Sequence, residues 1–112
     1  MEDMETRGDL NLQLLEGHQQ WKAVKAIQAT LHAHGFQVCI AGGAVRDLLL
    51  GRCPVDIDLA TSATPDDIEP LFDRVVMVGR QFGVCRVVVF DQAVELATFR
   101  QDGAYQLYLI HI

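Results

Sequence analysis

The chain has 112 residues, of which 50% are hydrophobic and 21% charged, so it has room for one small globular domain and lacks the composition of a disordered chain. Its net charge of −6 argues against a domain that grips a nucleic-acid backbone by itself, because such binding depends on clustered Lys and Arg. The apolar stretches are far shorter than the ~20 residues of a membrane span, and the cysteines form no CxxC pair. We therefore expect a cytoplasmic protein that does not contact membranes.

Two regions precede the first strand. Residues 1–16 show no sustained pattern and are predicted to form a loose leader. Between residues 18 and 34, the apolar Trp21, Val24, Ile27 and Leu31 recur three or four positions apart. This spacing predicts an amphipathic helix, which Gly35 ends.

The later elements alternate between strand and helix before a run of strands. In chain order they are a strand at 36–41, a helix at 44–50, a strand at 55–61, a helix with Thr64 as N-cap and Asp67 in a capping box, and strands at 74–78, 85–90 and 93–99, with a tight turn at Asp91–Gln92. This order predicts an α/β or α+β fold, in which helices pack against a mixed sheet.

Two aspartates separated by one residue stand in the strand predicted at 55–61. On a strand, Asp56 and Asp58 leave the same face, roughly 6–7 Å apart, while Val55, Ile57 and Leu59 point into the core. Neighbouring carboxylates repel each other unless a cation compensates them, and Mg²⁺ prefers one or two carboxylates together with phosphate oxygens. The pair thus suits metal-assisted phosphoryl or nucleotidyl transfer, although a solvated strand face is the simpler alternative.

A glycine pair precedes the acidic strand. Gly42 and Gly43 lie where a strand ends and a helix begins, so the backbone can approach an anion closely, and Arg46 follows in the first helical turn. The alternative is an ordinary strand–helix turn with a surface arginine. The stretch lacks the spacing of a dinucleotide fingerprint and the Gly-Lys-Ser/Thr of a P-loop.

Other charged residues extend this candidate site. Glu95 is predicted to leave its strand on the face opposite Val94 and Leu96, and it converges on Asp56 and Asp58 if the two strands are neighbours. The alternative for Glu95 is a solvated strand position. Arg100 is either an ion-pair partner or a substrate contact, and the sequence does not separate these roles.

The motifs "GGAVRDLLLG", "PVDIDLATSATP", "GRQFGVCRVVV" and "ELATFRQDGAY" occur in the order found in one family. Across residues 18–105 the chain resembles the head domain of class II tRNA nucleotidyltransferases and bacterial poly(A) polymerases. The resemblance implies a polymerase-β-like fold, in which an RNA 3′-hydroxyl attacks the α-phosphorus of a nucleotide. It also implies that Gly43 and Arg46 contact ATP or CTP, that Asp56 and Asp58 bind Mg²⁺, and that Glu95 is the third acid.

The end of the chain departs from the family pattern. Residues 17–106 are expected to form an incomplete head domain, and residues 107–112 an atypical end, because "LYLIHI" stands where an Asp-Gly-Arg-rich segment usually follows. The resemblance implies that later neck, body and tail segments select the base and hold the tRNA. We therefore expect little or no CCA addition by these 112 residues alone.

Several alternatives stay open on the sequence. The leading hypothesis is tRNA CCA addition with Mg²⁺, ATP and CTP, and polyadenylation by the same family is not separated from it. A catalytically dead nucleotide-binding remnant is a rival. A DxD sugar-nucleotide transferase is disfavoured, because its metal motif does not normally follow a GGxVRD turn. The sequence does not indicate an oligomeric state.

Overall fold

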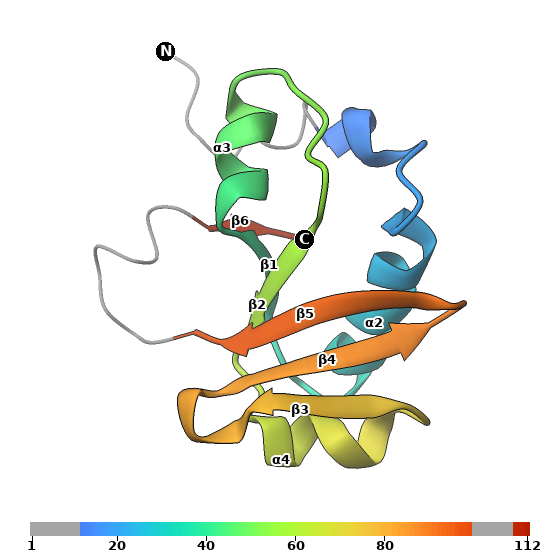
Figure 1. Cartoon of the computed structure of the whole chain (residues 1–112), viewed down its shortest axis with the longest axis vertical. Coiled ribbons are helices and arrows are strands. Elements are labelled where there is room, and N and C mark those ends of the chain that lie inside the picture. The colour runs from blue at the N-terminus through green and yellow to red at the C-terminus, as the bar shows by residue number, and fades with distance from the viewer. Residues whose placement is uncertain (1–11, 100–108) are drawn as a thin grey trace.

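The computed structural model describes residues 12–99 and 109–112, and within them the strands form a six-stranded mixed sheet of order β3-β4-β5-β2-β1-β6 (Figure 1). Its elements are η1 (Leu12–Leu15), α2 (Trp21–Ala33), β1 (Val38–Ala41), α3 (Gly43–Leu49), β2 (Asp58–Thr61), α4 (Pro65–Ile68), η2 (Glu69–Leu71), β3 (Val75–Gly79), η3 (Arg80–Phe82), β4 (Val84–Val89), β5 (Gln92–Thr98) and β6 (Ile110–His111). The mixed sheet with flanking helices is therefore confirmed. No helix in these residues is long and apolar enough to cross a membrane.

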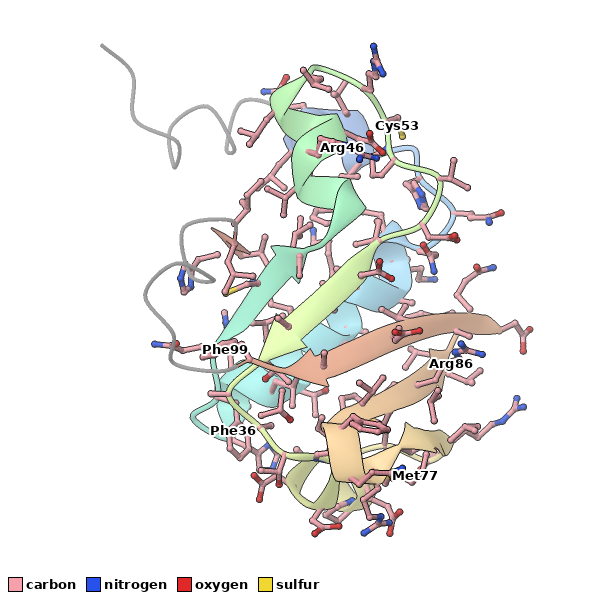
Figure 2. All side chains as sticks on the ribbon, turned by 60° about the vertical axis from the view of Figure 1, so that its left-hand side comes forward. Phe36, Arg46, Cys53, Met77, Arg86 and Phe99 are labelled. Carbon is pink, nitrogen blue, oxygen red and sulfur yellow. The ribbon has the colours of Figure 1, made fainter. Side chains whose placement is uncertain are left out.

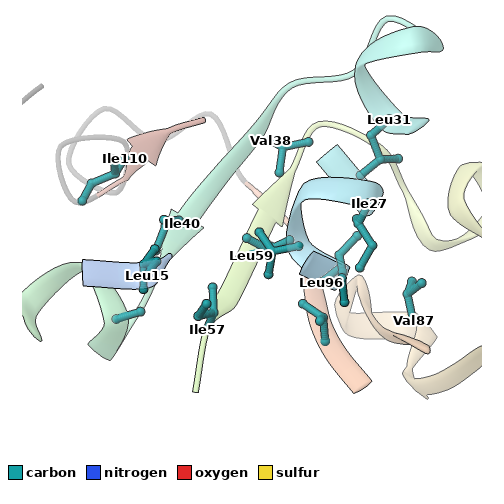
Figure 3. Packing of buried hydrophobic residues seen from close by; sticks show 14 of the residues in the cluster. Leu15, Ile27, Leu31, Val38, Ile40, Ile57, Leu59, Val87, Leu96 and Ile110 are labelled. Atoms are coloured by element: carbon teal, nitrogen blue, oxygen red, sulfur yellow. The ribbon is translucent and has the colours of Figure 1, made fainter. Parts of the chain in front are cut away.

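The core lies between α2 and the sheet. Val24, Ile27 and Leu31 are fully buried, which confirms the predicted apolar stripe, and α2 ends before Gly35, whose φ is +85°. These residues belong to one hydrophobic cluster with Leu59 and Leu96 from the centre of the sheet, and Figure 3 shows Ile27 of α2 beside these two side chains. Burying such side chains is the main driving force that holds α2 on this face.

The two central strands are parallel neighbours. β2 pairs with β5 in parallel, with Leu59 opposite Leu96, and pairs with β1 antiparallel, with Ala41 opposite Asp58. β3, β4 and β5 form an antiparallel meander on the far side of β5. This topology brings the start of β2 beside both the end of β1 and the middle of β5.

The segment predicted as a loose leader is partly ordered. Leu12–Leu15 form a 3₁₀ helix whose Leu15 is fully buried in the core, so the expectation of a loose segment is wrong for its last residues. An apolar side chain that reaches the core gains enough burial energy to fix one short turn. At the other end, β6 pairs with β1 and Ile110 is buried, whereas residues 1–11 and 100–108 lie outside the described part.

Two local predictions near the β3–β5 meander, a capping box and a tight turn, agree closely with the structure. Thr64 and Asp67 form the predicted capping box at the start of α4. The β4–β5 turn is centred on Phe90 and Asp91, with φ of +53° and +62°, one residue before the predicted turn. Positive φ at both central residues matches the twist of a two-residue hairpin, so Gln92 already belongs to β5.

Candidate active site

Three carboxylates line one cavity near the start of β2. Asp56, Asp58 and Glu95 border a cavity of about 250 Å³, and its other lining residues are Gln20, Ile57, Arg86 and Ala93. Glu95 stands between the buried Val94 and Leu96 on β5, so it points away from the core. Because β5 is the parallel neighbour of β2, the condition under which Glu95 converges on the aspartates is met.

The backbone around the acidic pair differs from the expectation. β2 begins only at Asp58, Asp56 lies in a bend, and Val55 is 84% exposed, so the prediction that Val55 points into the core is wrong. Pro54 has no N–H to donate to a ladder. The carbonyl oxygens of Pro54 and Val55 contact His18 Nε2 at 3.0 Å, so side chains replace a neighbouring strand there.

Asp58 has the most perturbed environment of the three acids. Its pKa is raised by burial first, then by the charge of Glu95, and then by that of Asp56. Glu95 and Asp56 are therefore both close enough to Asp58 for their charges to act on its carboxyl. One nearby cation offsets this charge, because Arg86 Nη2 lies 3.5 Å from Glu95 Oε2 across the β4–β5 pair.

We expect Asp58→Asn to stabilise the fold at neutral pH. The carboxyl of Asp58 has a higher pKa folded than unfolded, so the folded state binds the proton more tightly. The contribution of Asp58 to the stability of the unsubstituted chain is therefore largest at low pH, and it falls as pH rises from the unfolded pKa of 3.8 through the raised folded pKa. Urea unfolding of both chains at pH 3 and pH 7 checks this, and an unchanged or lower midpoint for Asp58→Asn at pH 7 would contradict it.

The two glycines of the turn lie against different charged side chains, Gly42 against Asp58 and Gly43 against Arg46. Gly42 has φ +67° and ψ −146°, and a Cβ built on it would stand 3.5 Å from Asp58 Oδ2. A Cβ on Gly43 would stand 3.7 Å from Arg46 Nη2, so the guanidinium folds back over the turn. The Arg46 side chain is 75% exposed, and its Nε lies 3.8 Å from Asp47 Oδ1.

The Arg46 guanidinium, the backbone of the two glycines and the Asp58 carboxylate thus lie next to one another at the glycine turn. Figure 2 shows Arg46 on α3 and Arg86 beside β5, with the start of β2 between them in this view. Arg100, the remaining predicted nucleotide contact, lies outside the described residues.

The donor set fits a divalent cation that phosphate oxygens complete. Among residues 12–99 and 109–112, no three acidic, histidine or cysteine side chains form a ready-made metal cage. Two carboxylates on one cavity nevertheless meet the requirement of Mg²⁺, which keeps water or phosphate oxygens as its remaining ligands. A bound cation would also relieve the repulsion by Glu95 and Asp56 that, after burial, raises the pKa of Asp58.

Comparison with known proteins agrees with this geometry. Residues 38–108 match the family described as Poly A polymerase head domain. The chain belongs to this family. The match covers the glycine turn, the acidic residues and the meander, which confirms the resemblance expected from the motifs. As a member of the Poly A polymerase head domain family, the chain has the polymerase-β-like fold expected for it.

Several curated relatives are CCA-adding enzymes. The enzyme of Bacillus pumilus is 49% identical over 77 residues, and that alignment covers 69% of this chain and 19% of the relative. A crystal structure of the Bacillus stearothermophilus CCA-adding enzyme in complex with CTP matches with a TM-score of 0.68 and 37% identity, covering 84% of this chain and 23% of that one. The Thermotoga maritima CCA-adding enzyme complexed with tRNA shares the fold, with a TM-score of 0.58 and 22% identity over 79% of this chain and 23% of that one. The chain spans about a fifth of the length of the curated relatives that it matches.

Sequence reasoning missed two polar members of the cavity, Arg86 and Gln20. Arg86 carried a usable signal in the sequence, because it is the one charged residue within the apolar run "VCRVVV". In the structure it stands directly opposite Glu95. Gln20 carried no such signal in the sequence, since a polar residue just before a helix is commonplace. Its placement depends on packing that local pattern does not encode.

Proposed function

We propose that this head domain binds ATP or CTP with Mg²⁺ and serves CCA addition to tRNA. One observation carries the proposal: Asp56, Asp58 and Glu95 line a single cavity, and Gly42 lies against the Asp58 carboxylate. The relatives are named CCA-adding enzymes, and the one from Thermotoga maritima is complexed with tRNA, which supports tRNA as the RNA substrate.

Each residue has a distinct role in the proposal. Asp56 and Asp58 hold the cation from the start of β2, and Glu95 adds negative charge from β5. Gly42 leaves room for phosphate oxygens beside Asp58, because a side chain there would occupy that space. Arg46 is exposed next to Gly43, where its guanidinium can pair with a phosphate.

The chemistry follows from charge. Bound Mg²⁺ would neutralise phosphate oxygens and make a nearby hydroxyl more acidic. Asp56 and Asp58 keep that cation beside the glycine turn, and Arg46 orients the phosphates. Arg86 lies within ion-pair distance of Glu95, so its charge offsets part of the negative charge that the third carboxylate adds to the cavity. These residues bind and orient the nucleotide, while an RNA 3′ end supplies the nucleophile.

Nucleotide binding by the 112-residue chain tests the proposal. CTP and ATP are titrated with and without Mg²⁺, for the unsubstituted chain, Asp58→Ala and the control Asp73→Ala, whose exposed carboxylate borders a different cavity. We expect binding that requires Mg²⁺, at least about 10-fold weaker for Asp58→Ala and unchanged for Asp73→Ala. Binding indifferent to both Mg²⁺ and Asp58 would instead indicate a catalytically dead remnant.

Transfer activity separates the two RNA reactions. We expect little or no CCA addition by these 112 residues alone, and clear tRNA-dependent CTP incorporation would overturn that expectation.

The family description favours polyadenylation as a second candidate. Extension of an arbitrary RNA with ATP alone would support that candidate, whereas CTP incorporation confined to tRNA lacking CCA would exclude it.

A further inference from the structure

Two side chains just before α2 hold the acidic segment. His18 Nε2 lies 3.0 Å from the carbonyl oxygen of Pro54 and 3.0 Å from that of Val55. The backbone N–H of Gln20 donates to His18 Nδ1 at 3.0 Å. Nδ1 is therefore the acceptor, and the ring proton on Nε2 is donated to the carbonyl oxygens. His18 thus anchors the backbone immediately before Asp56.

Gln20 joins this segment to β5. Its Oε1 accepts from the N–H of Ile57 at 2.8 Å, and its Nε2 donates to the carbonyl oxygen of Ala93 at 2.9 Å. Ile57 stands between Asp56 and Asp58, and Ala93 stands two residues before Glu95. A single amide therefore connects the backbones that carry all three acids.

The position of this amide explains its importance. Gln20 occupies the N-cap position of α2, yet its side chain makes no capping bond and is instead 7% exposed between the two strand segments. The β2–β5 ladder begins only at the pair Leu59 and Leu96. Ahead of that pair, the Gln20 side chain takes the place of a ladder hydrogen bond, and it also lines the acidic cavity.

We propose that Gln20 is a positioning residue that sets the separation between the Asp56–Asp58 segment and Glu95, with His18 bracing the same segment. The inference rests on the proposed function of this cavity as a site for a divalent cation and a nucleotide. Among residues 12–99 and 109–112, no strand pairs with Asp56, so the place of its carboxylate depends on these side-chain contacts to its neighbours Val55 and Ile57. Partners that orient metal ligands typically change metal affinity 10–100-fold when they are removed.

Gln20→Met tests the role, because it keeps the length of the side chain and removes both hydrogen bonds. Gln19→Met is the matched control, since Gln19 is exposed and adjacent. Mn²⁺ binding is measured by electron paramagnetic resonance, well below the unfolding temperature of each variant. We expect about 10-fold weaker Mn²⁺ binding for Gln20→Met and an unchanged dissociation constant for Gln19→Met. An unchanged dissociation constant in a folded Gln20→Met would overturn the inference.

A merely structural role would lower the unfolding temperature without moving the Mn²⁺ dissociation constant. If Gln20→Met does not fold, nuclear magnetic resonance on the unsubstituted chain tests the positioning role instead. There, the Gln20 side-chain amide and the Ile57 N–H should shift together on Mg²⁺ titration, and resonances that stay still at saturation would overturn the inference.

The two proposals fail in different ways. Loss of Mn²⁺ binding in Asp58→Asn with no effect of Gln20→Met would leave the proposed function standing and remove only the positioning role. No Mn²⁺ binding by the unsubstituted chain would remove both.

Discussion

Gly42→Ala is expected to lower the free energy of unfolding by about 2–3 kcal/mol and to abolish Mg²⁺-dependent nucleotide binding. Its φ of +67° with ψ of −146° is open to glycine but strained for any residue with a Cβ. The added methyl would also stand 3.5 Å from Asp58 Oδ2, in the space proposed for phosphate. Urea unfolding measures the first effect and CTP titration the second.

Gly35→Ala is the control that separates strain from crowding. Gly35 also has a positive φ, +85°, but no atom lies within 4 Å of a Cβ built there. We expect a stability loss of about 1 kcal/mol with nucleotide binding intact in the fraction that is folded. Equal loss of binding in both variants would show that Gly42 acts through stability alone, and would contradict its role in the site.

Leu59→Ala is expected to cost about 3 kcal/mol of folding free energy. Leu59 is 1% exposed, follows Asp58 directly, and stands between Ile40 of β1 and Leu96 of β5. The cavity left by the lost side chain cannot close easily, because both flanking strands are fixed by hydrogen bonds. For a domain of this size, that cost is a large share of the total stability.

Leu50→Ala is the matched control for this core substitution. Leu50 is 60% exposed, so its truncation should change the free energy of unfolding by no more than about 0.5 kcal/mol. Chemical denaturation of the two variants side by side gives the comparison. Similar midpoints for Leu59→Ala and Leu50→Ala would contradict the placement of Leu59 in the core.

Features set by neighbouring residues were predictable from the sequence. The stripe of Val24, Ile27 and Leu31 predicted α2, because one turn of helix fixes which side chains share a face. The capping box of Thr64 and Asp67 was predictable for the same reason, since both partners lie within one turn. The sequence could place Glu95 beside the acidic pair only on the condition that their two strands are neighbours. The parallel pairing of β2 with β5 fulfils this condition.

Features set by distant residues escaped prediction. Alternation suggested a strand from Val55, but the bend at Val55 and Asp56 is held by His18 and Gln20, which lie more than 30 positions earlier in the chain. No period in the sequence records a contact of that separation. The burial of Leu15 was missed for the same reason, because a short 3₁₀ turn has too few residues to show a period.

The parallel pairing of β2 with β5 also bears on how the chain folds. It joins residues 59–61 to residues 96–98 across a connection that contains β3 and β4, whereas the meander joins strands that follow one another directly. Closing the longer loop costs more chain entropy, so hydrogen-exchange pulse labelling during refolding should find β3–β5 protected before β2. The acids at 58 and 95 then meet only in the late phase of refolding, and a chain trapped earlier carries a finished meander in which the proposed cation site is not yet assembled.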